Sequence, residues 1–128
     1  MYVRFVVDEI SEDSGVELGI FQATYRLWRV GQLHSGAEVW WADIDEWFGR
    51  KLETPNRFAR SRRRGANDCA ICWFKASATR HVARAHELVA LLAEHHVPSR
   101  MLRTRRPGYV VYEDEFQVAA EPFRRELQ

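Results

Sequence analysis

The sequence has few cysteines, no long apolar stretch and no glycine-rich phosphate loop. No segment approaches the roughly 20 apolar residues that cross a bilayer, so no membrane span is expected. The two cysteines, Cys69 and Cys72, fall inside one apolar run, as expected of thiols that pack as small hydrophobic residues in a reducing compartment. The apolar N-terminal run is too short for a signal peptide, which favours a cytoplasmic location. The missing glycine-rich loop argues against a Walker-type nucleotide site, and we expect no cofactor.

Charge is nearly balanced over the whole chain but unevenly placed along it. The formal net charge is +1, so no overall field draws the chain to DNA or anionic lipid. Residues 1–52 carry a net charge of −4, residues 53–106 carry +8, and residues 107–128 carry −3. Seventeen of the 19 cations are arginine, whose planar guanidinium matches phosphate and carboxylate groups. We therefore expect the basic segment, residues 53–106, to bind a partner that carries phosphate groups.

The hydrophobic pattern predicts a single α+β domain over residues 1–128. Its expected order is β-α-α-β-α-β-β-β, with a mixed sheet on which a helical hairpin and a crossover helix pack. The hairpin is expected over about 15–51, an Arg-rich loop over about 53–68, and a sheet-forming β-α-β-β-β part over about 69–123.

Two capping boxes, Ser14–Glu17 and Ser35–Glu38, predict where the helices of the hairpin begin. A helical stripe is expected to form the buried face of the first helix, and it comprises Leu18, Phe21, Tyr25 and Trp28. The corresponding stripe of the second helix comprises Trp40, Ile44 and Trp47.

A β-α-β unit follows the Arg-rich loop. The apolar run 69–74 predicts a strand covered on both faces, and Ser77 is a candidate N-cap for the third helix. His95 and His96 fall at the end of that helix, where imidazoles bind the last carbonyls. A strand over 100–104 is expected to run parallel to the strand over 69–74. Residues 109–112 and 116–120 are expected to form a hairpin that closes the sheet, with an acidic turn between them.

Two arginine clusters are candidate sites for RNA or single-stranded DNA. Basic loops with an interleaved aromatic residue suit such ligands, because charge follows the backbone while a ring stacks on a base. The first cluster, on the central loop, comprises Arg57, Phe58, Arg60, Arg62, Arg63 and Arg64. The second comprises Arg100, Arg103, Arg105 and Arg106. Solvation of the surface, or pairing with acidic helices, explains such clusters equally well.

The start of the third helix is a candidate anion site. Amides at a helix start attract anions, and the hydroxyls of Ser77 and Thr79 could add donors. Cations are unfavourable at this end of a helix unless an anion or a neighbouring acid compensates them. The cations concerned are Arg80, Arg84 and, if protonated, His81. Lys75 begins the same candidate segment, just before the helix.

Three motifs look chemical, but only one keeps a functional interpretation. Cys69 and Cys72 form a Cys-x-x-Cys pair within an apolar run, which suits neither redox chemistry nor a metal site. The acids 113–115 fit a solvated turn. His81 lies beside Arg80, so it remains a weak candidate for a general acid or base acting on a phosphodiester.

Several stretches resemble a group of short bacterial proteins to which no activity is assigned. The resemblance is carried by Trp73-Phe74-Lys75 and by Arg106-Pro107-Gly108-Tyr109-Val110-Val111-Tyr112-Glu113-Asp114. It implies a bacterial, intracellular, stand-alone domain and transfers neither ligand nor catalytic residue.

Three functional hypotheses therefore stand. The first is a binding module that engages nucleic acid or another phosphorylated ligand through an Arg-rich surface. The second is a non-catalytic interaction subunit or homodimer that uses the acidic, Trp-rich helical hairpin. The third is a small phosphodiesterase or transferase that uses His81, for which replacing His81 should abolish turnover while sparing binding.

Overall fold

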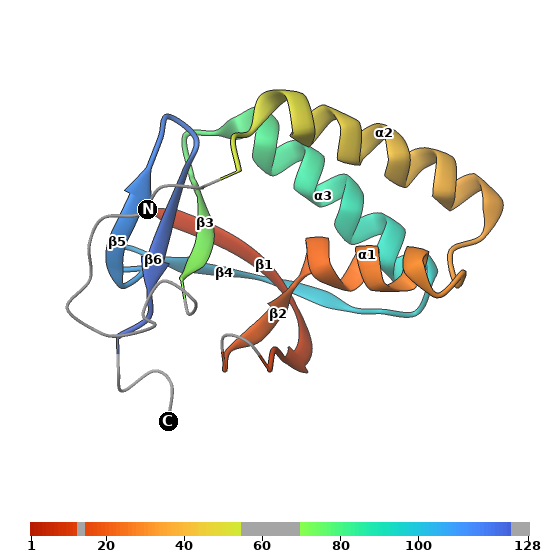
Figure 1. Cartoon of the computed structure of the whole chain (residues 1–128), viewed down its shortest axis with the longest axis horizontal. Helices are drawn as coiled ribbons and strands as arrows, with labels where there is room; N and C mark the ends of the chain where they lie inside the picture. Colours follow the sequence, from red (N-terminus) through yellow and green to blue (C-terminus); the bar gives the residue numbers. More distant parts are fainter. Residues whose placement is uncertain (13–14, 55–69, 124–128) are drawn as a thin grey trace.

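The computed structural model describes residues 1–12, 15–54 and 70–123, which form six strands and three helices. The helices lie together on one side of a single antiparallel sheet (Figure 1). In chain order the elements are β1 (Tyr2–Ile10), β2 (Glu17–Gly19), α1 (Ile20–Arg29), α2 (Ser35–Lys51), β3 (Ile71–Lys75), α3 (Thr79–Glu94), β4 (Ser99–Thr104), β5 (Tyr109–Glu113) and β6 (Gln117–Glu121). The α+β class and the predicted order are confirmed, with the short strand β2 added. No helix among these residues is long and apolar enough to cross a membrane.

Strand β1 is the centre of the sheet and has three partners. Along one edge it pairs with β4 over Tyr2–Val7. Along the other edge it pairs with β3 at Tyr2 and Val3, and with β2 at Val6 and Ile10. Strand β3 continues to β6, and β6 pairs with β5. The β2 and β3 partners therefore leave a fork beside Arg4 and Phe5.

The predicted mixed sheet is wrong, because every strand pairing is antiparallel. Strands β3 and β4 run in the same direction, as predicted, since each is antiparallel to β1. They are not neighbours, because β1 lies between them and α3 crosses over it. The N-terminal strand β1 thus occupies the position beside β3 that the β-α-β pattern predicted for β4.

The main core lies between β1 and the helices. Alternate residues of β1 point to the helical side, so Val3, Phe5 and Val7 are buried there. Helix α3 contributes Ala85, Leu88 and Leu92. Helix α2 contributes Ile44, Trp47 and Phe48. The predicted stripe of α2 is thus largely confirmed, because Ile44 and Trp47 are buried and Trp40 packs against the core.

Helix α1 differs from its prediction in both start and buried face. The expected first turn is extended as β2, Gly19 is the N-cap, and Ser14 lies outside the described residues. The buried side chains are Ile20, Ala23 and Thr24, whereas Phe21, Tyr25 and Trp28 are exposed. Small residues let α1 lie close to α3, and Trp28 instead stacks on Trp41 of α2, with ring centroids 5.0 Å apart.

Two predicted helix caps are also corrected. Helix α2 is capped by His34, whose Nδ1 accepts from the amide of Ala37 at 3.2 Å, rather than by Ser35. Helix α3 has Ala78 at the N-cap position, and no side chain caps it, so Ser77 does not take the predicted role. At the other end of α3, a ring nitrogen of His95 contacts the carbonyl of Leu91 at 2.9 Å, which confirms the predicted interaction.

Candidate functional site

The structure describes one of the two predicted arginine clusters. The residues of the central loop lie outside the described residues, and they are Arg57, Phe58, Arg60, Arg62, Arg63 and Arg64. The remaining candidates are described, and they are Lys75, Ser77, Thr79, Arg80, Arg84, Arg103, Arg105 and Arg106. Their positions decide whether charge gathers on one part of the surface.

Sheet register brings the end of β3 close to the end of β4. Lys75 and Thr104 both pair with Tyr2, from opposite sides of β1. Two strand spacings therefore separate them, which is about 10 Å. The turn after Lys75 leads directly into α3, so Arg80 follows the end of β3, whereas Arg103 lies on β4 and two further arginines follow that strand. We call Arg80, Arg103, Arg105 and Arg106 the basic end.

Ion pairs separate the candidate cations into two sets. Lys75 contacts Glu113 at 2.6 Å, and this hydrogen bond raises the pKa of Lys75. Arg84 contacts Asp43 and Glu87, each at 3.3 Å, and also lies over the ring of Trp47. The four arginines of the basic end form no ion pair with a carboxylate among the described residues. Most of the described candidate charge is thus left unneutralised.

An aromatic pair, of which Tyr109 is exposed, lies against Arg106 of the basic end. The Arg106 guanidinium lies 4.9 Å from the centroid of Phe123, which packs edge-on against Tyr109 at 4.9 Å. Tyr109 is 63% exposed, so one face of its ring is available to a flat partner. The sequence pattern had placed the stacking ring at Phe58 and did not identify Tyr109, because only the chain reversal at Gly108 brings this strand back to the arginines.

His81 is buried in an aromatic cage and is only 4% exposed. Its Nε2–H donates to the carbonyl of Lys51 at 2.7 Å. Phe116 stacks on the imidazole at 4.3 Å, and Trp47 packs against its edge at 4.9 Å. The imidazole links the end of α2 to α3 and the hairpin, and it presents no open face to a substrate. This environment gives the predicted acid–base role no support.

The Cys-x-x-Cys pair has no counterpart in the structure, because Cys69 lies outside the described residues. Cys72 is exposed, which corrects the expectation that the strand covers it on both faces. Its partial burial nevertheless raises the pKa of the thiol, and the charge of Arg4 opposes this effect only in part. Among the described residues no group of His, Cys, Asp and Glu side chains could hold a metal ion.

The raised pKa of Cys72 predicts slow alkylation near neutral pH. In a Cys69→Ser background, iodoacetamide should modify Cys72 more slowly at pH 8 than it modifies free cysteine, because less thiolate is present. The rate should rise as the pH passes the usual thiol range. Mass spectrometry of the alkylated fraction measures this, and an alkylation rate equal to that of free cysteine would contradict it.

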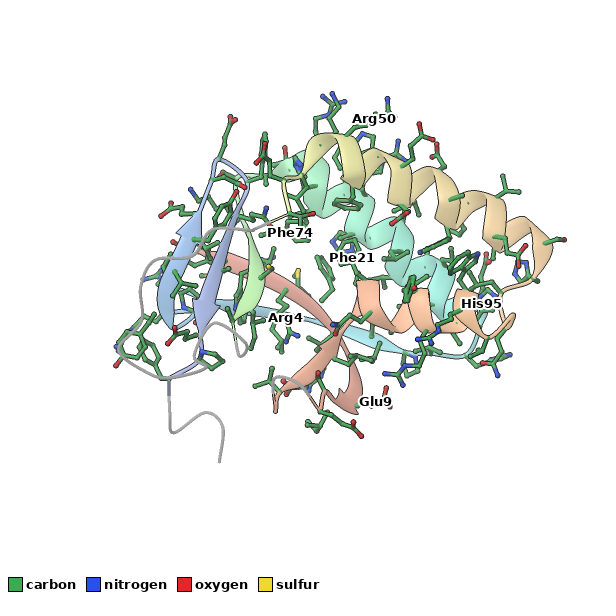
Figure 2. The ribbon with its side chains drawn as sticks, viewed as in Figure 1. Arg4, Glu9, Phe21, Arg50, Phe74 and His95 are labelled. Carbon is green, nitrogen blue, oxygen red and sulfur yellow. The ribbon has the colours of Figure 1, made fainter. Side chains whose placement is uncertain are left out.

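A cleft opens at the fork between β2 and β3, and sequence reasoning missed it. Its volume is about 640 Å³. The walls include Arg4, Phe21, Phe48, Phe74 and Cys72. Figure 2 shows Arg4, Phe21 and Phe74 around this region, between β3 and the start of α1. No local motif marks the cleft, since it arises where β1 exchanges one partner strand for another.

Arg4 is the cation of this cleft. Its Nη2 donates to the Glu17 carbonyl at 2.6 Å, but it forms no ion pair among the described residues. The Glu17 carboxylate instead contacts Arg100 at 3.2 Å. Burial lowers the pKa of Arg4, although Glu17 partly opposes this shift. The β1 pattern marked Arg4 only as a polar residue within an apolar strand.

These features define an α+β domain with a basic end and a separate cleft that contains a partly desolvated arginine. Comparison with protein-family models, with curated proteins and with solved structures finds no match. The resemblance to short bacterial proteins stays a prediction. Function must therefore be argued from the two sites themselves.

Proposed function

We propose that this protein is a non-catalytic module that binds single-stranded nucleic acid at the basic end. The observation that carries the proposal is that none of the four arginines of the basic end forms an ion pair with a carboxylate among the described residues. Arg80 follows β3 and the other three lie on or just after β4, and the last residues of both strands pair with Tyr2. A phosphate backbone gains most of its affinity from such cations, because binding them releases condensed counterions.

The aromatic pair favours a single strand over a duplex. Tyr109 is exposed beside Phe123 and Arg106, and bases of a single strand can stack on such a ring without sequence preference. Stacked bases in a duplex are not available for this contact. The proposal therefore predicts weaker binding to duplexes of the same charge per length.

Fluorescence anisotropy with labelled oligonucleotides tests the proposal. Poly-U RNA and poly-dT DNA of about 12 nucleotides span one small binding site. We expect Arg103→Glu/Arg105→Glu to weaken binding by at least about tenfold and to reduce the slope of log affinity against log salt by about 2. The reason is that each arginine neutralises about one phosphate.

The matched control is Arg29→Glu/Arg50→Glu, which makes the same change in net charge on α1 and α2. It should leave affinity close to that of the unchanged protein. Equal losses of affinity in both double variants would show that only net charge matters and would contradict the proposed site. Replacing Arg62, Arg63 and Arg64 with Gln reports separately on the Arg-rich segment.

The exposed aromatic residues of α1 favour a second candidate function. Tyr25 and Trp28 are exposed and in contact, Trp28 stacks on Trp41, and Asp45 lies one turn after Trp41 on α2. This acidic, Trp-rich face would suit an interaction subunit or homodimer. Absence of oligonucleotide binding together with a dimer in light scattering would favour this function over the first.

A further inference from the structure

We propose that the cleft beside Arg4 binds a small organic carboxylate with an apolar, ring-containing body, independently of the basic end. The cleft volume of about 640 Å³ lies within the roughly 300–1,000 Å³ typical of sites for small molecules. Three separate observations indicate the ligand: the N–H donors that Arg4 leaves free, the aromatic walls, and two acidic residues elsewhere in the lining.

Arg4 supplies the reason for an anion. A guanidinium has five N–H donors, and the hydrogen bond from Arg4 to the Glu17 carbonyl engages only part of this capacity. Glu17, the acid whose charge acts on Arg4, has its carboxylate in contact with Arg100. A carboxylate in the cleft would accept from the remaining donors in the paired geometry that arginine favours. It would also offset the cost of burying the charge.

The walls supply the reason for an apolar body with a ring. Phe21 packs edge-on against Phe48 at 4.9 Å and lies 6.1 Å from Phe74. Phe5 and Trp73 add further aromatic surface to the lining. The Trp73 Nε1 is buried and has no acceptor among the described residues, so its N–H signal reports on changes within the wall. Edge-to-face contacts to such rings favour an aromatic ligand.

Two acids limit the charge that the ligand can carry. Asp45 and Glu53 line the cleft and are exposed. Asp45 lies on α2 and Glu53 follows that helix, whereas Arg4 lies on β1, and neither acid forms an ion pair with Arg4 among the described residues. They would repel a polyphosphate while leaving a single carboxylate at Arg4 undisturbed. The cleft therefore suits a monoanion and not the nucleic acid proposed for the basic end.

Amide NMR titration of the full chain provides the test. The probes are phenylacetate, indole-3-acetate and isovalerate, each compared with its neutral amide. We expect the ring carboxylates to shift signals of the cleft residues, including the Trp73 indole N–H, and their amides to bind at least about tenfold more weakly. Isovalerate should bind more weakly than either ring compound.

Two kinds of variant identify the contacts. Arg4→Gln should weaken phenylacetate binding by at least about tenfold while leaving the affinity for phenylacetamide unchanged. Gly49 lines the cleft from α2, and a Cβ there would meet nothing within 4 Å. Gly49→Phe should therefore fill the cleft and abolish binding of both compounds without disturbing the fold.

Gly49→Ala is the matched control, because it adds one methyl group at the same position. It should keep binding and stabilise α2, since glycine is a poor helix former. Cleft shifts that are absent for every carboxylate would overturn the proposal. Phenylacetate affinity that is unchanged in Arg4→Gln would also overturn it. If Arg4→Gln fails to fold, unchanged phenylacetate affinity in Gly49→Phe would do the same.

Discussion

Gly108→Ala is expected to lower the free energy of unfolding by more than about 3 kcal/mol. Gly108 has a φ of +133°, which side chains rarely adopt. An added Cβ would also lie 2.0 Å from the carbonyl oxygen of Glu121 and 2.7 Å from its carbon. Backbone on both sides of this contact belongs to the β5–β6 pair, so relief requires that Tyr109 and Glu121 separate.

Urea unfolding followed by tryptophan fluorescence measures this effect. Gly31→Ala is the matched control, because Gly31 also has a positive φ, +73°, but its Cβ would meet nothing within 4 Å. It should show only the conformational cost, about 1 to 2 kcal/mol. Similar losses at both positions would mean that the close approach at Glu121 is relieved without cost.

His81→Ala should lower the free energy of unfolding by about 2 to 4 kcal/mol. The change removes a ring that contacts Trp47 and Phe116, and it leaves the Lys51 carbonyl without its donor. His81→Phe restores the ring volume but not the hydrogen bond, so it should recover part of the loss. Thermal or urea unfolding distinguishes the two contributions.

His86→Ala is the control for His81, since His86 is exposed on the same helix and only touches the ring of Phe5. Its effect should stay below about 1 kcal/mol. A His81→Ala variant as stable as His86→Ala would contradict the structural role. It would then return His81 to the list of candidate catalytic groups.

Sequence patterns predicted those parts of the fold that depend on neighbouring residues. The stripe of α2, the interaction of His95 with the carbonyl of Leu91 and the hairpin around Asp114 all follow from spacings of four residues or fewer. At Asp114, burial alone would raise the pKa, yet hydrogen bonds from Gln117 and Phe116 lower it. The acids in this turn thus have the local role that was expected.

The predictions that were wrong concern residues whose environment is set by distant strands. A stripe of Phe21, Tyr25 and Trp28 is the most hydrophobic face of α1, but close packing on α3 favoured the smaller Ala23 and Thr24. Arg4 looks like an ordinary polar residue of a strand until β2 and β3 are placed on the same edge. Neither the packing of α1 on α3 nor the placement of β2 and β3 along β1 can be predicted from composition or residue spacing.

The pairing of β1 with β4 joins Val3 to Arg103, 100 positions later in the chain. During synthesis the first strand emerges early and waits, with its apolar side chains uncovered, for a segment made near the end. Such a high contact order slows folding and prolongs exposure to aggregation. A nascent chain that stops short of β4 would therefore be a natural client for chaperones.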